Sequence, residues 1–570
     1  MAQGDGGQEP SAVAELADAA WTHVLTTEPY YALRTGAPVE HLPRGTLDEA
    51  AREAAVGTRI LAGLNNLDLT HSTAADRDTA ALLRHIAREW ARAEDSWWWS
   101  FPVAPYQTYE LSIYGQQVLR SFVFADGSDV DRFLSLVADT AGWVRTAQDK
   151  TAEQAGAGWG LPRPALPGFV AAVRGHRAAA EEWVRIDEAR TRQLSAAQRG
   201  RLRDGLDRLV ADELRAAFDD LLGYLAGPAE DTAVDEVGLG QYPGGEAAYR
   251  HLVRSSATFD IEPEEVHRLG LEQVGELTEQ MAKVRAEAGF DGGEAEYRRF
   301  LEKDPRFHAV SAEDVASTYL RHIGAVEPVV GQWFSVLPRA PYGVERIDPA
   351  LEPSLSYGMY EPPTPGNPTG RYRYNGSGLD TRSQINAAAL ILHELVPGHH
   401  FHLARQAEDA RLHPIRAQFA PMMLPAYSEG WAEYAATLGF EMGVYDDPWD
   451  RYGAYQHQRF VAQRLVLDTG LNLLGWTLEK AREYMAATTM ESAEQIRTET
   501  LRYSTDIPGQ ALGYRLGCLK LRELRDRAKT ALAAGFDVRD FHEVVLGAGT
   551  LPLDAVEDNV DRFIAERSAR

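Results

Sequence analysis

The segment that most constrains this chain is residues 393–400, which read His-Glu-Leu-Val-Pro-Gly-His-His. It follows the fully apolar run 387–392, which is typical of a buried helix. Ionisable side chains after such a run cost several kcal/mol unless they are paired or bound to a metal ion, which disfavours a chance match on the surface. The segment therefore predicts a zinc site in which His393 is a ligand and Glu394 is the general base.

The spacing of the histidines does not fit a straight helix. In the common HExxH pattern the second His lies four residues after the first, and here that position is Pro397. At about 100° per residue, His399 would be turned by roughly 240° from His393, whereas His400 would return to the same face about two turns higher. Proline clashes with the carbonyl four residues back, and Gly398 adds backbone freedom. We expect a kink or bulge that makes His399 the second ligand, with His400 as the alternative.

A second carboxylate motif, Tyr-Ser-Glu-Gly-Trp-Ala-Glu-Tyr, follows downstream. Glu429 and Glu433 are four residues apart and share one helical face. Catalytic zinc commonly has three protein ligands, and Glu429 is predicted to be the third. Glu433 would then accept the free N–H of a ligand histidine. The alternative is an amphipathic helix with solvated glutamates, which the neighbouring Trp431 and Tyr434 disfavour.

Two further segments supply candidates for contact with a substrate. Near the C-terminus, Tyr514 is predicted to donate a hydrogen bond to a developing oxyanion, and Arg502 or Arg515 to pair with a substrate carboxylate. Upstream of the His-Glu pair, residues 354–375 carry tyrosines on both sides of a Pro/Gly-rich centre, which predicts two short strands joined by a loop. Ordinary packing is the alternative for all of them. The residues proposed to touch substrate or to support the ligands are His400, Glu433, Tyr503, Gln510, Arg515 and Asn375.

Bulk composition excludes several classes of protein. Lys+Arg number 58 and Asp+Glu 84, a net charge of −26, which argues against nucleic-acid partners and anionic membrane surfaces. Cys518 is the single cysteine, so an internal disulfide is excluded and a reducing cytoplasm is expected. No run approaches the roughly 18–20 apolar residues of a membrane span. Residues 1–10 are polar and glycine-rich, which predicts a disordered tail without a targeting signal.

Helical periodicity dominates the rest of the chain. Leucines at three-to-five spacing predict a helix over 196–225, Pro263 and two following glutamates predict one from 263 to 288, and 311–337 suggests a further pair. We predict a mainly α fold with a small β-hairpin or short sheet beside the metal-binding helix. An N-terminal helical region (11–235) and a catalytic region (236–570) should form one compact body with a deep cleft between them.

Four motifs in order resemble the bacterial domain-of-unknown-function 885 family. They are His-Glu-Leu-Val-Pro-Gly-His-His, Ser-Glu-Gly-Trp-Ala-Glu-Tyr, Pro-Gly-Gln-Ala-Leu-Gly-Tyr at 508–514, and Tyr-Pro-Gly-Gly-Glu at 242–246 with Tyr249 and the helix start at Pro263. The resemblance implies a helical fold similar to Taq-type thermostable carboxypeptidases and, more distantly, thimet-type oligopeptidases. Carried over from those relatives, His393, His399 and Glu429 match the metal ligands and Glu394 the base. The two extra residues before His399 depart from their pattern.

These observations predict a zinc-dependent hydrolase that cleaves an amide or peptide bond in a small peptide or amide-bearing molecule, as a carboxypeptidase or small-peptide peptidase would. Another divalent ion could replace zinc. One alternative is a metal-dependent enzyme that acts on a non-peptide metabolite, by amide hydrolysis or by elimination. A second is a metal-free binding protein, which the retained Glu394 disfavours. The oligomeric state is left open, with a homodimer as one possibility.

Overall fold

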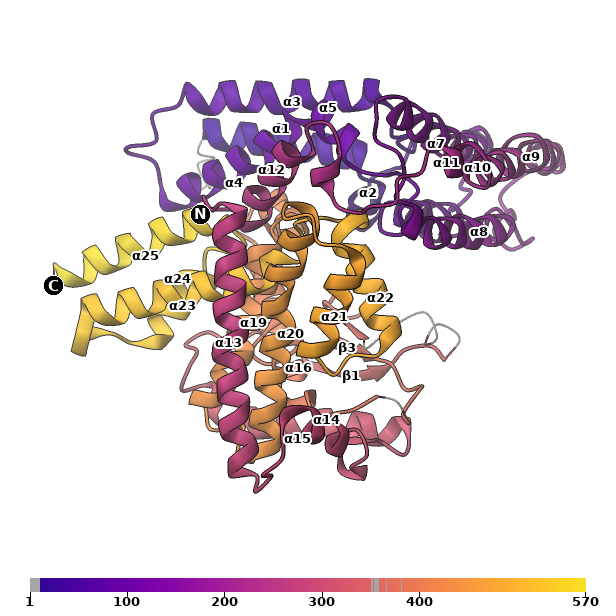
Figure 1. The fold of residues 1–570 in the computed structure, drawn as a ribbon. Helices are drawn as coiled ribbons and strands as arrows, with labels where there is room; N and C mark the ends of the chain where they lie inside the picture. The colour runs from indigo at the N-terminus through magenta and orange to yellow at the C-terminus, as the bar shows by residue number, and fades with distance from the viewer. Residues whose placement is uncertain (1–10, 350–351, 353–357, 365, 381, 570) are drawn as a thin grey trace, which may run out of the picture.

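The computed structural model describes residues 11–349, 352, 358–364, 366–380 and 382–569. The fold is mainly α-helical with one small three-stranded sheet, as the sequence predicts (Figure 1). The predicted tail, residues 1–10, lies outside the described residues. None of the described helices has both the length and the apolar composition that a bilayer-crossing helix needs.

The N-terminal helices form the upper layer in Figure 1, and α7 to α10 extend to one side of it. They are α1 (Ala12–Thr27), α2 (Pro29–Thr35), α3 (Leu47–Asn65), α4 (Ala74–Trp90), α5 (Ala93–Trp99), α6 (Tyr109–Ser112), α7 (Ser128–Gly156), α8 (Leu166–Trp183), α9 (Ala196–Arg208), α10 (Arg215–Leu225), α11 (Pro228–Asp231) and α12 (Gly245–Ala257). The predicted helix 196–225 is confirmed as α9 and α10, joined by a π-helical segment over 209–214.

The remaining helices include the long pair α13 and α20, which pack side by side below the upper layer in Figure 1. They are α13 (Pro263–Glu287), α14 (Glu294–Leu301), α15 (Ala312–Val330), α16 (Ala387–Glu394), α17 (His399–Glu408), α18 (Ala420–Met423), α19 (Pro425–Glu441), α20 (Pro448–Asn472), α21 (Leu478–Thr488), α22 (Ala493–Leu501), α23 (Leu512–Leu532), α24 (Val538–Leu546) and α25 (Leu553–Ser568). The helix that begins at Pro263 is confirmed. The expected pair over 311–337 is wrong: α15 is a single helix, and the apolar residue Phe334 that follows it packs into the core from non-helical chain.

In the described part of the chain, eight short helical segments connect these elements. Four are π-helical: η1 (Ile113–Leu119), η3 (Leu209–Leu214), η7 (Ile415–Phe419) and η8 (Arg502–Asp506). Four are 3-10 turns: η2 (Arg163–Ala165), η4 (Leu239–Gln241), η5 (Pro305–Phe307) and η9 (Ala533–Gly535).

The sheet contains the predicted hairpin and one additional strand. β2 (Gly358–Glu361) pairs antiparallel with β3 (Gly370–Tyr374), so the two-strand prediction is confirmed for its described part. β1 (Tyr342–Arg346) pairs parallel with β3, which gives the order β1-β3-β2. Strand β1 was not predicted, because its partner strand lies more than twenty residues downstream and local patterning does not reveal such a pairing.

The hydrophobic core does not follow the boundary expected near residue 235. One buried cluster joins residues between 13 and 90 with residues between 312 and 560. A second cluster contains residues from 42 to 266 and also Leu465, Leu512 and Leu516. Both clusters therefore contain side chains from each of the two predicted regions. The helices that carry the candidate ligands, α16, α17 and α19, lie in the first cluster, which fixes their relative positions.

Candidate metal centre

The His-Glu segment is split between two helices. α16 ends at Glu394 and α17 begins at His399, so the expected kinked or bulged helix is instead a break over residues 395–398. Proline cannot continue the hydrogen-bond ladder. Gly398 packs so tightly that a Cβ atom would lie 1.8 Å from the carbonyl oxygen of His393. This turn returns the chain toward α16, and the rings of His393 and His399 lie 4.8 Å apart between centroids.

Three of the predicted ligands converge at this turn. Glu429 Oε2 is 3.5 Å from His393 Nε2 and 3.3 Å from His399 Nε2. The ligand atoms of the three side chains all lie within 4.8 Å of one another. Tetrahedral zinc with bonds of about 2.0–2.1 Å separates its ligand atoms by about 3.3 Å. The spacing and the donor types therefore fit one divalent ion of this size, with a further position left for another ligand.

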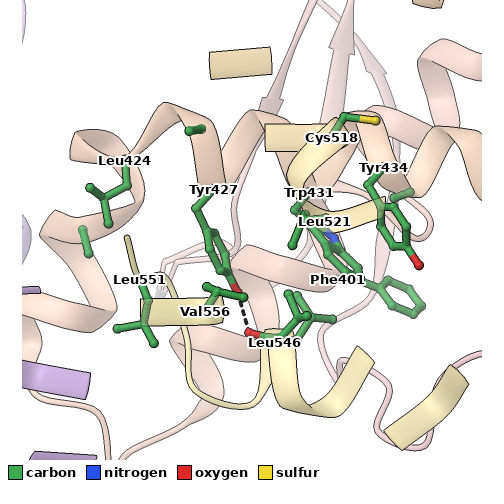
Figure 2. Packing of buried hydrophobic residues seen from close by; sticks show 14 of the residues in the cluster. Phe401, Leu424, Tyr427, Trp431, Tyr434, Cys518, Leu521, Leu546, Leu551 and Val556 are labelled. Atoms are coloured by element: carbon green, nitrogen blue, oxygen red, sulfur yellow. Dashed lines mark hydrogen bonds between the residues drawn. The ribbon is translucent and has the colours of Figure 1, made fainter. Parts of the chain in front are cut away.

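Helix α19 supplies Glu429 and also fixes the turn that carries His399. Trp431 donates its indole N–H to the carbonyl oxygens of Pro397, at 3.1 Å, and Gly398, at 3.2 Å. Figure 2 shows Trp431 packed with Tyr434 and Phe401 beside side chains of α23 and α24. On the same helix, Tyr427 donates to the carbonyl of Val545 at 2.8 Å (Figure 2). The helix is buried on nearly all sides, so the alternative of solvated glutamates does not describe it.

Glu433 lies behind His393, where the sequence analysis expects a supporting carboxylate. Its Oε1 is 3.1 Å from His393 Nδ1 and 2.9 Å from His457 Nε2. His457, on α20, was not identified from the sequence, since it belongs to no motif and lies 24 residues beyond Glu433. The three side chains form a second group with metal-compatible spacing. Because His393 directs Nε2 to the first group and Nδ1 to the second, Glu433 and His457 are placed to hold its ring.

The electrostatics of the site favour positive charge on His393. Burial alone lowers the pKa of His393, but the carboxylates of Glu429 and Glu433 outweigh it and raise this pKa well above its ordinary value. Burial raises the pKa of Glu429, but the nearby histidines His399 and His393 reverse this and hold it well below its usual range. Burial also raises the pKa of Glu394. Metal ions and protons compete for the same imidazole nitrogens, so the carboxylates that favour the proton also favour a cation.

His400 does not join the group of ligands. Its Nδ1 is 2.8 Å from the hydroxyl of Tyr360, and its Nε2 is 3.0 Å from the carbonyl oxygen of Ala340. Burial lowers the pKa of His400 to about 4, so the ring is neutral and both nitrogens are used within the protein. The side chain ties α17 to strand β2 and to the segment before β1. Of the two alternatives from the sequence, the structure brings His399 to Glu429.

Tyr514 lies near Glu429, beside a network of arginines. The negative charge of Glu429 contributes to a pKa of Tyr514 that burial raises above its ordinary value. The guanidinium of Arg464 is 4.6 Å from the centre of the Tyr514 ring. Arg464 and Arg502 both donate to Glu499, at 3.3 and 3.2 Å. Two guanidinium groups therefore share one carboxylate next to the phenol.

The other residues predicted to contact substrate are engaged within the protein. Tyr503 accepts from Arg464 at 3.0 Å, and Gln510 accepts from Arg502 at 2.8 Å, so both belong to the arginine network. Arg515 is buried and donates to Gln458, at 3.4 Å, and to Gln273. It lies among amides rather than beside the candidate ligands, because its position on α23 faces α13 and α20.

Asn375 is buried in the loop that follows β3. Its amide N–H donates to the carbonyl of Glu352 at 2.7 Å, and its oxygen accepts from the backbone and hydroxyl of Ser377, both at 2.9 Å. These contacts correspond to the loop role that the sequence analysis gave as the alternative to substrate contact.

Comparisons with known proteins agree on the fold. The family model DUF885, described as a bacterial protein of unknown function, matches residues 29–560. A "putative lipoprotein" from Colwellia psychrerythraea is 23% identical, with a TM-score of 0.83, over 98% of this chain and 100% of that one. A "putative lipoprotein of unknown function" from Shewanella oneidensis is 17% identical, with a TM-score of 0.74, over 96% and 99%. No curated protein matches. At these identities the solved structures establish the fold alone.

Proposed function

Because this chain belongs to the bacterial DUF885 family, whose description gives no activity, we propose its function from the candidate site. We propose that the protein is a metal-dependent hydrolase of amide or peptide bonds. The observation that carries the proposal is the convergence of His393, His399 and Glu429 within 4.8 Å of one another, next to Glu394. Two imidazoles, a carboxylate ligand and an adjacent carboxylate base are the set that zinc hydrolases use.

The roles of the side chains follow from their positions. A divalent ion such as zinc, held by His393, His399 and Glu429, would polarise the substrate carbonyl and lower the pKa of water toward about 7. Glu394 takes a proton from the attacking water and delivers it to the leaving nitrogen. Tyr514 donates its phenolic hydrogen to the oxygen that becomes negative as the carbonyl carbon turns tetrahedral. Glu433 keeps the ring of His393 in a fixed orientation.

The arginines near Tyr514 favour a substrate with a carboxylate. In the described residues, Arg464 and Arg502 both form ion pairs with the single carboxylate of Glu499, beside the phenol. A guanidinium pairs well with a carboxylate because of its planar donor geometry. This arrangement supports cleavage near the free C-terminus of a small peptide, or of an N-acylated amino acid.

One experiment tests the chemistry and the metal together. Purified protein is analysed for metal content and assayed with and without chelator, on peptides with free and amidated C-termini and on N-acylated amino acids. We expect E394Q to lose about 10²–10⁴-fold in turnover with its metal content unchanged. The exposed Glu479, replaced by Gln, is the matched control and should keep full activity. Full activity of E394Q, or turnover that survives complete removal of metal, would contradict the proposal.

A cytoplasmic location is part of the same proposal. It rests on the single cysteine, Cys518, which is buried as a free thiol. The similar proteins from Colwellia psychrerythraea and Shewanella oneidensis are each described as a "putative lipoprotein", which offers the competing expectation of a membrane-anchored protein. Fractionation of the native host with an antibody against this chain would separate the two: recovery with the membranes would exclude the cytoplasmic location.

A further inference from the structure

The N-terminal helices surround a cavity that is separate from the candidate metal centre. Its volume is about 810 Å³, within the range of small-molecule binding sites. All of its lining residues lie between residues 23 and 150. None of the candidate ligands or their supporting residues contributes to it, so a role for this cavity is additional to the proposed hydrolase.

Charged side chains of both signs line the cavity in equal number. In the described residues, the carboxylates are Glu28, Glu49, Glu53 and Glu110, and the cations, histidines apart, are Arg44, Arg52, Arg59 and Lys150. Solvent reaches all of these side chains except that of Lys150, which is buried with 7% of its surface exposed. A free anion meets the carboxylates in this cavity and a free cation meets the arginines, so the lining favours a ligand without charge.

Lys150, on α7, has no carboxylate as an ion-pair partner in the described part of the chain. Its side-chain nitrogen donates a hydrogen bond to the hydroxyl of Ser100 at 3.2 Å and lies 4.9 Å from the centre of the Trp97 ring. Both of these residues also line the cavity. A neutral hydroxyl and an aromatic face therefore hold the nitrogen at the cavity wall, and neither replaces the counter-ion that a buried ammonium group needs.

This environment favours the neutral amine of Lys150. Burial lowers the pKa of the ammonium group to about 7, although the negative charge of Glu110 opposes the shift. A large share of the side chain is then uncharged at neutral pH, and a desolvated, uncharged lysine amine is a nucleophile. Lys150 therefore presents a reactive lone pair at the wall of the cavity, where an exposed lysine would carry a proton.

Two tryptophans in the lining offer ring surface and no free hydrogen-bond donor. Trp97 donates its indole N–H to the carbonyl oxygen of Gly45 at 2.9 Å, and Trp143 donates to Glu110, also at 2.9 Å. Because both N–H groups are used within the protein, a ligand meets only the apolar parts of these rings. Aromatic rings pack well against such surfaces, so the lining favours a ligand with an aromatic body.

We propose that this cavity binds a small, uncharged aromatic aldehyde and holds it as an imine on Lys150. The nitrogen lone pair of Lys150 attacks the carbonyl carbon, and the carbonyl oxygen takes up a proton to give a carbinolamine. The nitrogen lone pair then forms the C=N bond as the C–O bond breaks. Both amine hydrogens leave with the oxygen as water, so the step is balanced without an oxidant or a reductant. The site does not require the hydrolase to be active.

Reductive trapping on the full-length protein at pH 7.5 tests the proposal. Benzaldehyde at limiting concentration is the probe, cyanoborohydride reduces the imine to a benzylamine, and mass spectrometry of the peptides locates the benzyl group. Lys480 is the matched comparison, because it also lies over a tryptophan ring, 3.9 Å from the centre of Trp476, but is exposed. We expect Lys150 to be labelled at least about tenfold faster than Lys480. Equal labelling of the two lysines, or no label on Lys150, would overturn the proposal.

Variants and competing ligands assign the label and the class of ligand. K150R keeps a cation but removes the nucleophile, so it should lose the fast labelling while circular dichroism shows that it stays folded. K480R should keep the fast labelling, and so should E394Q, which separates this site from the proposed hydrolase. Benzoate and benzyltrimethylammonium in excess should leave the labelling of Lys150 unchanged. Protection by either ion would assign the cavity to a charged ligand and overturn the proposal, as would fast labelling that persists in K150R.

Discussion

Trp431 holds Gly398 in place from a neighbouring helix, because its indole N–H donates to the carbonyl oxygens of Pro397 and Gly398 at 3.1 and 3.2 Å. The same helix, α19, carries Glu429 two residues earlier. One rigid element therefore supplies the carboxylate and positions the turn that delivers His399. The distance between the candidate ligands depends on this relationship and not on α16 alone.

Replacement of Gly398 by Ala should weaken metal binding. A Cβ atom at this position would lie 1.8 Å from the carbonyl oxygen of His393, so the turn has to open and move His399. Overpacking of this kind costs about 1–3 kcal/mol, which corresponds to roughly 5–150-fold in metal affinity. Competition with a fluorescent chelator measures the change. Gly324, on α15 with open space around it, provides the control G324A, which should bind metal normally. Equal affinities of the two variants would contradict the role of the turn.

Replacement of His457 by Ala should lower metal affinity without removing a predicted ligand. Glu433 Oε1 lies 2.9 Å from His457 Nε2 and 3.1 Å from His393 Nδ1. Loss of His457 removes one of the two contacts that fix this carboxylate, so the carboxylate orients the ring of His393 less firmly. Loss of such supporting residues typically costs 10–100-fold in affinity. The exposed His71 provides the control H71A. If H457A and H71A retain the same affinity, Glu433 does not depend on His457.

Replacement of Tyr249 by Phe should destabilise the protein. Tyr249 donates to the fully buried Asp468 at 2.7 Å, and the same carboxylate accepts from the backbone N–H of Gly509 at 3.0 Å. Asp468 thus links α12, α20 and the turn before α23. A buried polar group that loses its hydrogen-bond partner costs about 1–3 kcal/mol, so Y249F should lower the Tm in a thermal melt. The exposed Tyr109, replaced by Phe, should leave it unchanged; a similar shift in both variants would refute the link.

Stability should fall as the pH rises from about 5 to 8.5, in part because of Glu28 and Glu53. Their pKa values are raised to about 8 and about 7, above the ordinary value of 4.5, by burial and by the charges of neighbouring glutamates. The folded protein therefore binds more protons than the unfolded chain between these values, and this stabilisation is complete below about pH 4.5 and is lost as each carboxyl ionises. Glu28 is exposed and Glu53 is half-buried, so solvent screens their charges and only the direction is predicted.

The double variant E28Q/E53Q isolates this contribution. It cannot ionise at these positions, so its Tm should depend less steeply on pH than that of the unaltered protein, with the largest gain in Tm at pH 8.5. Differential scanning fluorimetry at pH 5, 7 and 8.5 provides the comparison. The exposed Glu94, replaced by Gln, is the control. The same pH slope in all three proteins would show that the two carboxyls titrate as they do in the unfolded chain.

The sequence alone determined the helical class of the fold and the residue types of the candidate site. The apolar run before His393 identifies a buried helix, the four-residue spacing of Glu429 and Glu433 places both on one helical face, and Pro397 with Gly398 requires an interruption between the histidines. Each of these is a property of neighbouring residues, which the covalent chain and its local backbone preferences determine.

Only the tertiary structure decided which groups meet across the chain. It selected His399 over His400 through a turn held by Trp431, added His457 behind Glu433, paired β1 with β3, and gathered Glu28, Glu53 and Glu110 around one cavity. Residues far apart in the sequence come together through the packing of whole helices, and the burial that selects one arrangement is a sum over many side chains that no local pattern contains.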